Sequence, residues 1–165
     1  MMGLLNKSIQ IKPNKPETYM DLGIAFQSQS NFKAAIIFFQ KAIDMNPSYP
    51  EAYNNLGISF QREKNLIMAI SSYQQAIKLK PNYPEAFNNL ANSLQSKGNL
   101  DEAITFFQQS IRLRPNYPEA YNNLGVALKE EGMIVEAINS FQKAIELRPG
   151  YADAYWNLSL ARLLS

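Results

Sequence analysis

Asparagine side chains recur at a fixed interval along the sequence, and their chemistry is the most distinctive in the chain. One set steps by 34 residues: Asn55, Asn89, Asn123 and Asn157. A second set precedes it by one residue: Asn54, Asn88 and Asn122. A primary amide offers two N–H donors and a carbonyl acceptor. Each side chain can therefore pair with both the N–H and the C=O of a peptide bond, whatever side chain that peptide carries.

The composition excludes most catalytic chemistry. The 165 residues include no histidine and no cysteine, so there is no imidazole base, no thiolate nucleophile and no zinc site built from these residues. The acidic pairs Asp101-Glu102 and Glu130-Glu131 are adjacent in sequence and have no partner suited to general acid–base catalysis. The sequence has no glycine-rich phosphate loop and no metal-ligand cluster. We expect a protein that is not an enzyme and has no cofactor and no metal.

Charge and hydropathy limit the kinds of partner. The formal net charge of +2 is too small to indicate a nucleic-acid surface. No run of 18 apolar residues is present, so we expect no insertion into a membrane. The N-terminus lacks the charged and apolar regions of a signal peptide, which favours a cytoplasmic location.

The prolines divide the sequence into units of 34 residues. Two series have this spacing: Pro13, Pro47, Pro81, Pro115 and Pro149, and Pro16, Pro50, Pro84 and Pro118. A period of this length is typical of a repeat protein. Counting from the second series gives units at 16–49, 50–83, 84–117 and 118–151, with a head of 1–15 and a tail of 152–165. We therefore expect a single array over residues 1–165, and we number positions within each unit from its first proline.

Each unit is predicted to form two helices. The proline at position 1 suits the first turn of a helix, and the proline at position 32 ends the next helix. Gly98 and Gly132, at position 15, are expected to end the first helix, while Ser30 and Lys64 take this place in the first two units. Small residues at position 8 should let the paired helices approach closely. The aromatic rings at position 24 are expected to fill the space toward the neighbouring unit.

The repeated residues resemble those of the tetratricopeptide repeat family. Unit two carries Tyr53, Leu56-Gly57, Phe60, Ala69, Tyr73, Ala76 and Pro81. Unit four carries Tyr121, Leu124-Gly125, Leu128, Ala137, Phe141, Ala144 and Pro149. The departures in unit three are Ala91 for glycine and Ser110 for alanine. The resemblance implies an all-α fold, a right-handed α-solenoid of antiparallel helix hairpins with about ten helices. It also implies a scaffold for protein–protein interaction.

The units are also similar to the superhelical repeats of O-linked N-acetylglucosamine transferases and related bacterial repeat proteins. The segments 118–125 and 143–149 carry this similarity. Transferases of this class use an asparagine ladder to hold a peptide by its backbone. No catalytic glycosyltransferase sequence is present in the 165 residues.

The resemblance implies where the asparagines lie. In this family the first helix of each hairpin lines a concave groove, with positions 2, 5, 6, 9, 12 and 13 facing the partner. Asn55, Asn89, Asn123 and Asn157 take position 6, where the first unit has Asp21. Position 5 holds Asn54, Asn88 and Asn122, and position 9 adds Asn92. We expect these residues to form a peptide-binding groove. The alternative is that the asparagines serve repeat-to-repeat hydrogen bonding or helix solubility.

The two ends of the array differ from its middle. Leu5, Ser8 and Ile9 fall at positions 24, 27 and 28, so the head 1–15 is predicted to be the second helix of a truncated preceding repeat. The tail is predicted to be the first helix of a further repeat or a capping helix. Its outer side is apolar, with Trp156, Leu160, Leu163 and Leu164. This side favours either a segment cut from a longer array or an end-to-end contact through an open solenoid end, and the latter would give a homo-oligomer.

The leading hypothesis is a non-catalytic scaffold whose asparagine ladder holds an extended peptide or protein segment in the groove. One alternative is a self-assembling structural module that stacks end to end. The other is the substrate-recruiting arm of a glycosyltransferase whose catalytic part lies outside this chain.

Overall fold

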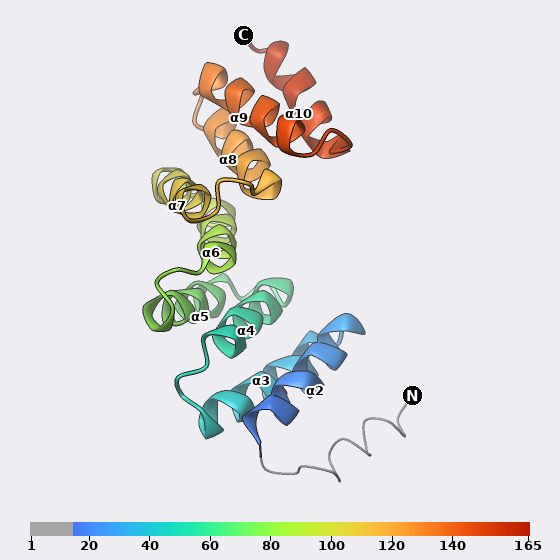
Figure 1. The fold of residues 1–165 in the computed structure, drawn as a ribbon, viewed down its shortest axis with the longest axis vertical. Coiled ribbons are helices and arrows are strands. Elements are labelled where there is room, and N and C mark those ends of the chain that lie inside the picture. Colours follow the sequence, from blue (N-terminus) through green and yellow to red (C-terminus); the bar gives the residue numbers. More distant parts are fainter. Residues whose placement is uncertain (1–14) are drawn as a thin grey trace. The chain divides into compact units, whose positions relative to one another are not determined.

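The computed structural model describes residues 15–165, and every regular element in this range is an α-helix (Figure 1). The helices are α2 (Pro16–Ser28), α3 (Phe32–Met45), α4 (Pro50–Arg62), α5 (Leu66–Leu79), α6 (Pro84–Ser96), α7 (Leu100–Leu113), α8 (Pro118–Glu130), α9 (Ile134–Leu147) and α10 (Ala152–Arg162). The all-α prediction is therefore confirmed for residues 15–165, which hold nine helices. The predicted second helix in the head, 1–15, falls outside the described residues except for Lys15, which precedes α2.

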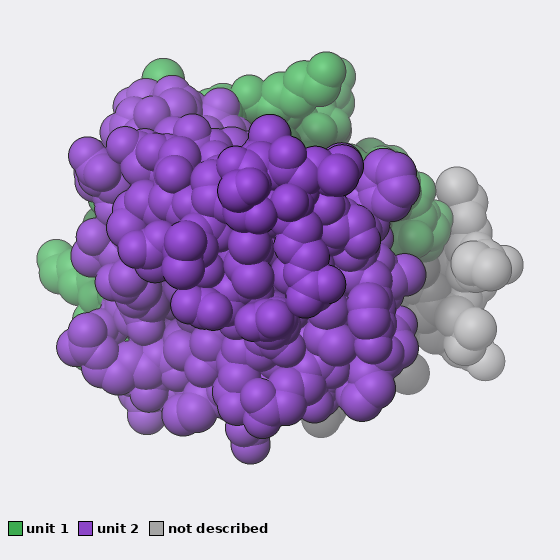
Figure 2. Space-filling view, turned by 90° about the horizontal axis from the view of Figure 1, so that it is seen from above, with its two compact units in different colours: residues 1–81 green, residues 82–165 purple. Residues whose placement is uncertain are grey.

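The helices are grouped in two compact units, residues 1–81 and 82–165, which Figure 2 colours green and purple. In the first unit, α2 pairs with α3 and α4 with α5, and α3 also packs on α4. In the second unit, α6 pairs with α7 and α8 with α9, and α7 packs on α8. The last helix, α10, packs on α9 and touches α8. Within each unit, consecutive helices are thus neighbours in space, as in a stack of hairpins.

Proline and asparagine set the starts of the helices. The first helix of each of the four hairpins begins at its proline, whose fixed φ suits the first turn. The second helices α3 and α5 follow Asn31 and Asn65, whose side chains accept from the N–H of Ala34 and Met68 at 3.2 Å. These asparagines are therefore helix N-caps as well as turn residues.

The turn inside each hairpin uses a left-handed residue. The φ angles are +57° at Ser30, +61° at Lys64, +88° at Gly98 and +85° at Gly132. Glycine takes this conformation without steric cost, whereas a residue with a Cβ is strained there. The first two hairpins thus make the same turn as the others without a glycine.

Replacing Lys64 with glycine is expected to raise the free energy of unfolding by about 1 kcal/mol, because the strain of the left-handed lysine is removed. Urea unfolding followed by circular dichroism measures the change. The matched control is Gly132→Lys, which should lower stability by about the same amount. A Lys64→Gly variant that is less stable than the original protein would contradict the assigned turn.

The core of each hairpin is an aromatic ring against a small residue. The rings of Phe39, Tyr73, Phe107 and Phe141 are fully buried. A Cβ added at Gly57 would lie 2.6 Å from the Tyr73 ring, and one at Gly125 would lie 2.5 Å from the Phe141 ring. The position-24 rings therefore pack on position 8 of their own hairpin. Phe39 also lies in one buried cluster with Ala52 and Leu56 of the next hairpin, so it fills the space toward the neighbouring unit as expected.

Tyr73 differs from the other three rings because its buried hydroxyl needs a partner. It donates a hydrogen bond to the side-chain oxygen of Gln61 at 2.9 Å. Burial raises the pKa of Tyr73 well above its usual value, and the nearby Arg62 opposes this only partly. The folded state therefore holds the Tyr73 proton more tightly than the unfolded chain, so stability is complete below pH 10 and declines as the pH rises beyond it.

The Tyr73→Phe variant is expected to lose less stability between pH 9 and about 11 than the original protein, because one group that must stay protonated is gone. At pH 7 the variant should lose only about 1 kcal/mol, since Gln61 is partly exposed and can hydrogen-bond water. Thermal melts at several alkaline pH values provide the comparison. Equal slopes for the two proteins would contradict the role given to the Tyr73 proton.

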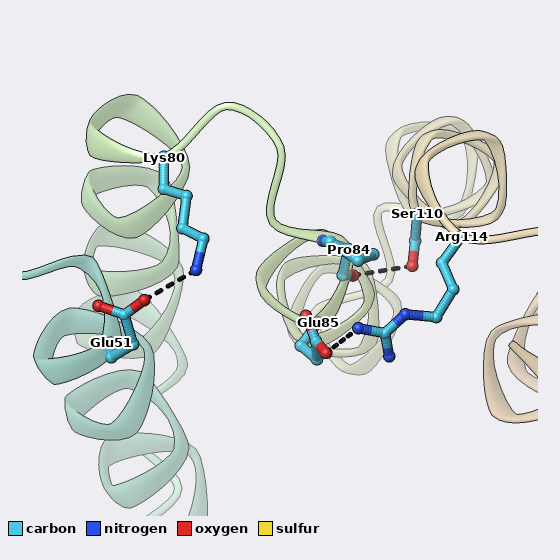
Figure 3. A network of polar contacts seen from close by, with 6 residues as sticks. All are labelled: Glu51, Lys80, Pro84, Glu85, Ser110 and Arg114. Atoms are coloured by element: carbon cyan, nitrogen blue, oxygen red, sulfur yellow. Dashed lines mark hydrogen bonds and ion pairs between the residues drawn. The ribbon is translucent and has the colours of Figure 1, made fainter.

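Ion pairs join the two ends of three hairpins. The carboxylate at position 2 of the first helix pairs with the cation at position 31, just after the second helix. The pairs are Glu51–Lys80, Glu85–Arg114 and Glu119–Arg148. Figure 3 shows the first two, together with the hydroxyl of Ser110, which donates to the carbonyl of Pro84 at 2.8 Å. Position 2 is therefore a partner for position 31, beyond its interaction with the helix dipole.

The pairing has an electrostatic consequence for the carboxylates. Partial burial alone would raise the pKa of Glu51, but the hydrogen bond from Lys80 and its charge lower it overall. Arg148 lowers the pKa of Glu119 in the same way. These glutamates are held ionised, which suits a structural link between the helices and not proton transfer.

Candidate functional site

The predicted groove residues lie in two layers on the first helices. The position-5 residues Asn54, Asn88 and Asn122, here called the inner amides, are buried. The position-6 residues Asn55, Asn89, Asn123 and Asn157, here called the outer amides, are partly exposed. Only the outer amides therefore have surface available for a partner.

Inner and outer amides hydrogen-bond to one another between consecutive first helices of the second unit. The side-chain N–H of Asn123 in α8 donates to the side-chain oxygen of Asn88 in α6 at 3.1 Å. Asn157 in α10 donates in the same way to Asn122 in α8 at 3.0 Å. These ladder bonds satisfy the buried side-chain carbonyls of Asn88 and Asn122. They match the alternative given for the asparagines, a repeat-to-repeat hydrogen bond.

The ladder bonds of Asn123 and Asn157 each use one N–H of an outer amide. Asn123 spends one N–H on Asn88, which leaves a second N–H donor and a carbonyl acceptor. The bond also fixes which edge of the amide carries the oxygen. Each bonded outer amide is thus oriented before any ligand arrives, and it still offers the donor and acceptor that a peptide bond requires.

The first unit lacks the ladder bond between α2 and α4. Position 5 of α2 is Met20, which is buried and has no amide oxygen to accept from Asn55. Position 6 of α2 is Asp21, which is exposed and can only accept hydrogen bonds when ionised. Gln27 joins these helices instead, donating to the hydroxyl of Ser59 at 3.2 Å. The described part of the first unit therefore holds a different polar link at this interface.

The residues beside the outer amides are mixed in character. At position 9 of the second unit, Asn92, Val126 and Leu160 are each partly exposed. One turn further along, the amide of Gln95 donates to the carboxylate of Glu130 at 2.7 Å. Sequence reasoning missed this link, whereas repeat-to-repeat hydrogen bonds between the asparagines were given as an alternative. The surface thus combines fixed amides with small apolar patches.

The outer side of α10 is exposed. Trp156 is 68% exposed, Leu163 81% and Leu164 64%, while Leu160 is partly buried. The helix buries Ala154, Leu158 and Ala161 on its opposite side, as the other first helices do. Among residues 15–165, no helix is long and apolar enough to cross a membrane.

Antiparallel hairpins with small residues under buried rings, stacked through the same contacts in each unit, define an α-solenoid repeat protein. The sequence matches a tetratricopeptide repeat model at residues 16–49 and 118–151, a second one at 38–71, and a TPR repeat model at 68–98 and 92–132. The chain belongs to the tetratricopeptide repeat family. The predicted fold class is thereby confirmed.

Solved structures agree with this assignment. A crystal structure of MamA protein is 27% identical, covers 90% of this chain and 81% of its own, and superposes with a TM-score of 0.81. YrrB, described as a TPR protein with an unusual peptide-binding site, is 24% identical over 96% of this chain and 82% of its own, with a TM-score of 0.77. A chain of the APC/C hetero-tetramer Cut9-Hcn1 is 26% identical, with a TM-score of 0.88 over 98% of this chain and 32% of its own. No curated protein sequence matches significantly.

Proposed function

We propose that this protein is a non-catalytic scaffold that holds an extended peptide or protein segment along the outer amides of its second unit. The proposal rests on the orientation, exposure and remaining hydrogen-bonding groups of Asn123 and Asn157. Each is oriented by a ladder bond, is partly exposed, and keeps one donor and one acceptor. A peptide bond presents the complementary acceptor and donor, so recognition would run through the peptide backbone.

The spacing of the outer amides suits an extended chain. Neighbouring helices pack about 8–10 Å apart, and an extended peptide advances about 3.3 Å per residue. One outer amide would then meet about every third peptide residue. Asn89, Asn123 and Asn157 would engage a segment of about six residues by the same estimate. The side chains between contacts would meet Asn92, Val126 and Leu160, which would set the preference for sequence.

The chemistry of the surface also indicates which partners it disfavours. Positions 5 and 6 carry no lysine or arginine in any unit. A clamp for an acidic C-terminal tail, which needs cations at these places, is therefore disfavoured. The proposed role as the recruiting arm of a glycosyltransferase would use the same amides. It differs only in what is attached to the scaffold.

Three variants separate a peptide contact from a purely structural ladder. Asn123→Ala removes the outer amide and leaves the buried oxygen of Asn88 without its partner, so it should lower stability by about 1–2 kcal/mol. Adding Asn88→Met, which copies the natural Met20, removes the stranded acceptor and should restore most of the stability. Asn88→Met alone removes the hydrogen-bond acceptor of Asn123 but leaves the Asn123 side chain in place.

Binding of a 12-residue peptide, selected from a random library against this protein, is then measured for each variant by isothermal titration. We expect Asn123→Ala and the double variant Asn88→Met/Asn123→Ala to bind about tenfold more weakly, because both lack the two hydrogen bonds to the peptide. Asn88→Met should bind within about threefold of the original protein, since the Asn123 amide is still present and loses only the hydrogen bond that orients it. Recovery of affinity in the double variant, together with its stability, would show that the ladder is structural only.

A further inference from the structure

Two arginines of the hairpins lie between a carboxylate and an aromatic ring. Each arginine is at position 31 of its 34-residue repeat, with a glutamate at position 2 and a tyrosine at position 34. In the third repeat, Arg114 pairs with Glu85, and its guanidinium carbon lies 4.9 Å from the centre of the Tyr117 ring. The fourth repeat has the same arrangement, with 4.7 Å between guanidinium and ring. Its members are Arg148, Glu119 and Tyr151.

The first repeat has the carboxylate and the ring but a neutral residue at position 31. Glu17 takes position 2, Tyr49 takes position 34, and Asn46 stands where the other repeats have a cation. The side-chain oxygen of Asn46 accepts a hydrogen bond from the N–H of Ser48 at 3.1 Å, so this short side chain is used within its own turn. Among residues 15–165, no ion pair involves Glu17.

The backbone around this site matches that of the arginine sites. The φ and ψ angles are −136° and 89° at Asn46, compared with −137° and 89° at Arg114 and −140° and 91° at Arg148. The helix that carries Glu17, α2, begins at its proline as α6 and α8 do. The carboxylate of Glu17 and the ring of Tyr49 therefore border the same kind of space that Arg114 fills in its own hairpin.

Negative charge gathers beside the Tyr49 ring. Asp21 follows Glu17 by one helical turn on the same side of α2, and both carboxylates are exposed. Burial raises the pKa of the Tyr49 hydroxyl, and the charges of Glu17, Glu51 and Asp21 raise it further. At the tyrosines of the third and fourth repeats, the position-31 arginine opposes such a rise. The first repeat thus keeps the acidic surroundings without a position-31 cation to balance them.

We propose that Glu17, Asp21 and Tyr49 form a binding site for a guanidinium group, the side chain of an arginine supplied by a partner. A guanidinium is planar, so it can pair with a carboxylate and stack on a ring at the same time, as Arg114 does. The site lies in the first unit and uses none of the outer amides of the second unit. It is therefore independent of the peptide binding proposed above.

Nuclear magnetic resonance of the isotope-labelled protein can locate this binding. Two probes carry the guanidinium: Nα-acetyl-arginine amide and the end-blocked pentapeptide Ala-Ala-Arg-Ala-Ala. The control is Nα-acetyl-citrulline amide, which has the shape of arginine without its charge. We expect the arginine probes to shift the signals of Glu17 and Tyr49 with millimolar affinity, and citrulline to bind about tenfold more weakly.

The two arginine probes distinguish the sources of the group. Tighter binding of the pentapeptide would show that the site reads an arginine within a chain. Equal affinity would show that the guanidinium is read alone, as in free arginine. Both results support the site itself.

Variants at position 31 test the comparison between the hairpins. Asn46→Arg supplies an internal guanidinium and should abolish binding in the first unit, whereas the neutral control Asn46→Gln should bind like the original protein. Conversely, Arg148→Asn should create a second site, seen as new shifts at Glu119 and Tyr151. Circular dichroism confirms that each variant folds.

The charge of Glu17 is tested by Glu17→Gln. This variant should weaken the arginine probes about threefold, the size of an exposed ion pair, and leave citrulline unchanged. Arginine probes that bind no better than citrulline would overturn the proposal. An Asn46→Arg variant that binds arginine as well as the original protein would overturn it too.

Discussion

Replacing Phe107 with alanine is expected to lower the free energy of unfolding by about 3–5 kcal/mol. The ring is fully buried in the hairpin of α6 and α7, where the buried alanines Ala91 and Ala103 are too small to fill the space it leaves. A loss of this size approaches the whole stability of many domains, which is about 5–15 kcal/mol. The variant should therefore be partly unfolded near body temperature.

Urea unfolding followed by circular dichroism measures this change. The control is Val135→Ala in α9, where the side chain is 66% exposed and the expected change is within about 0.5 kcal/mol. If Phe107→Ala lost no more stability than Val135→Ala, the ring would not be the centre of its hairpin.

The second large effect is expected from Gly125→Leu. A Cβ at this position would lie 2.5 Å from the Phe141 ring, so a leucine must push the ring or the helices apart. We expect a loss of about 3 kcal/mol from this overpacking. The natural Ala91 shows that one methyl group is accommodated in the third hairpin, but leucine adds three further carbons.

Two variants make the Gly125 experiment specific. Gly150→Leu is the control, because nothing lies within 4 Å of a Cβ at Gly150, and its stability should stay within about 0.5 kcal/mol. The double variant Gly125→Leu/Phe141→Ala should be more stable than the sum of the two single losses predicts, since the leucine fills the space left by the ring. Strict additivity would mean that the two residues do not share this space.

Much of the fold followed from local rules in the sequence. Pro50, Pro84 and Pro118 begin helices because proline fixes φ at a helical value and lacks a donor that the first turn does not need. The turns were also predictable at Gly98 and Gly132. Ser30 and Lys64 adopt the same left-handed conformation because the rest of the hairpin closes only through that turn. The contact of the position-24 rings with the glycine of their own hairpin was missed, since it depends on the space over that glycine between two helices.

The candidate site was predictable in its residues but not in its bonding. The repeat showed that Asn88 and Asn122 share one equivalent position on successive first helices, and that Asn89 and Asn123 share another. It could not show that Asn123 donates to Asn88, because this depends on the offset between two helices that are 35 residues apart in sequence. The division into buried inner amides and exposed outer amides follows from the same offset. The spacing of the asparagines along the sequence does not by itself determine which of them are buried.

We propose that the outer amides hold a peptide by its backbone. The most direct measurement is a scan in which each amide of the selected 12-residue peptide is N-methylated in turn, with binding to the protein followed by isothermal titration. Methylation removes a backbone donor and leaves the side chains unchanged. We predict losses of about tenfold that recur at about every third residue, the spacing of neighbouring first helices. Binding that tolerates N-methylation throughout, and depends instead on particular side chains, would rule out recognition through the peptide backbone.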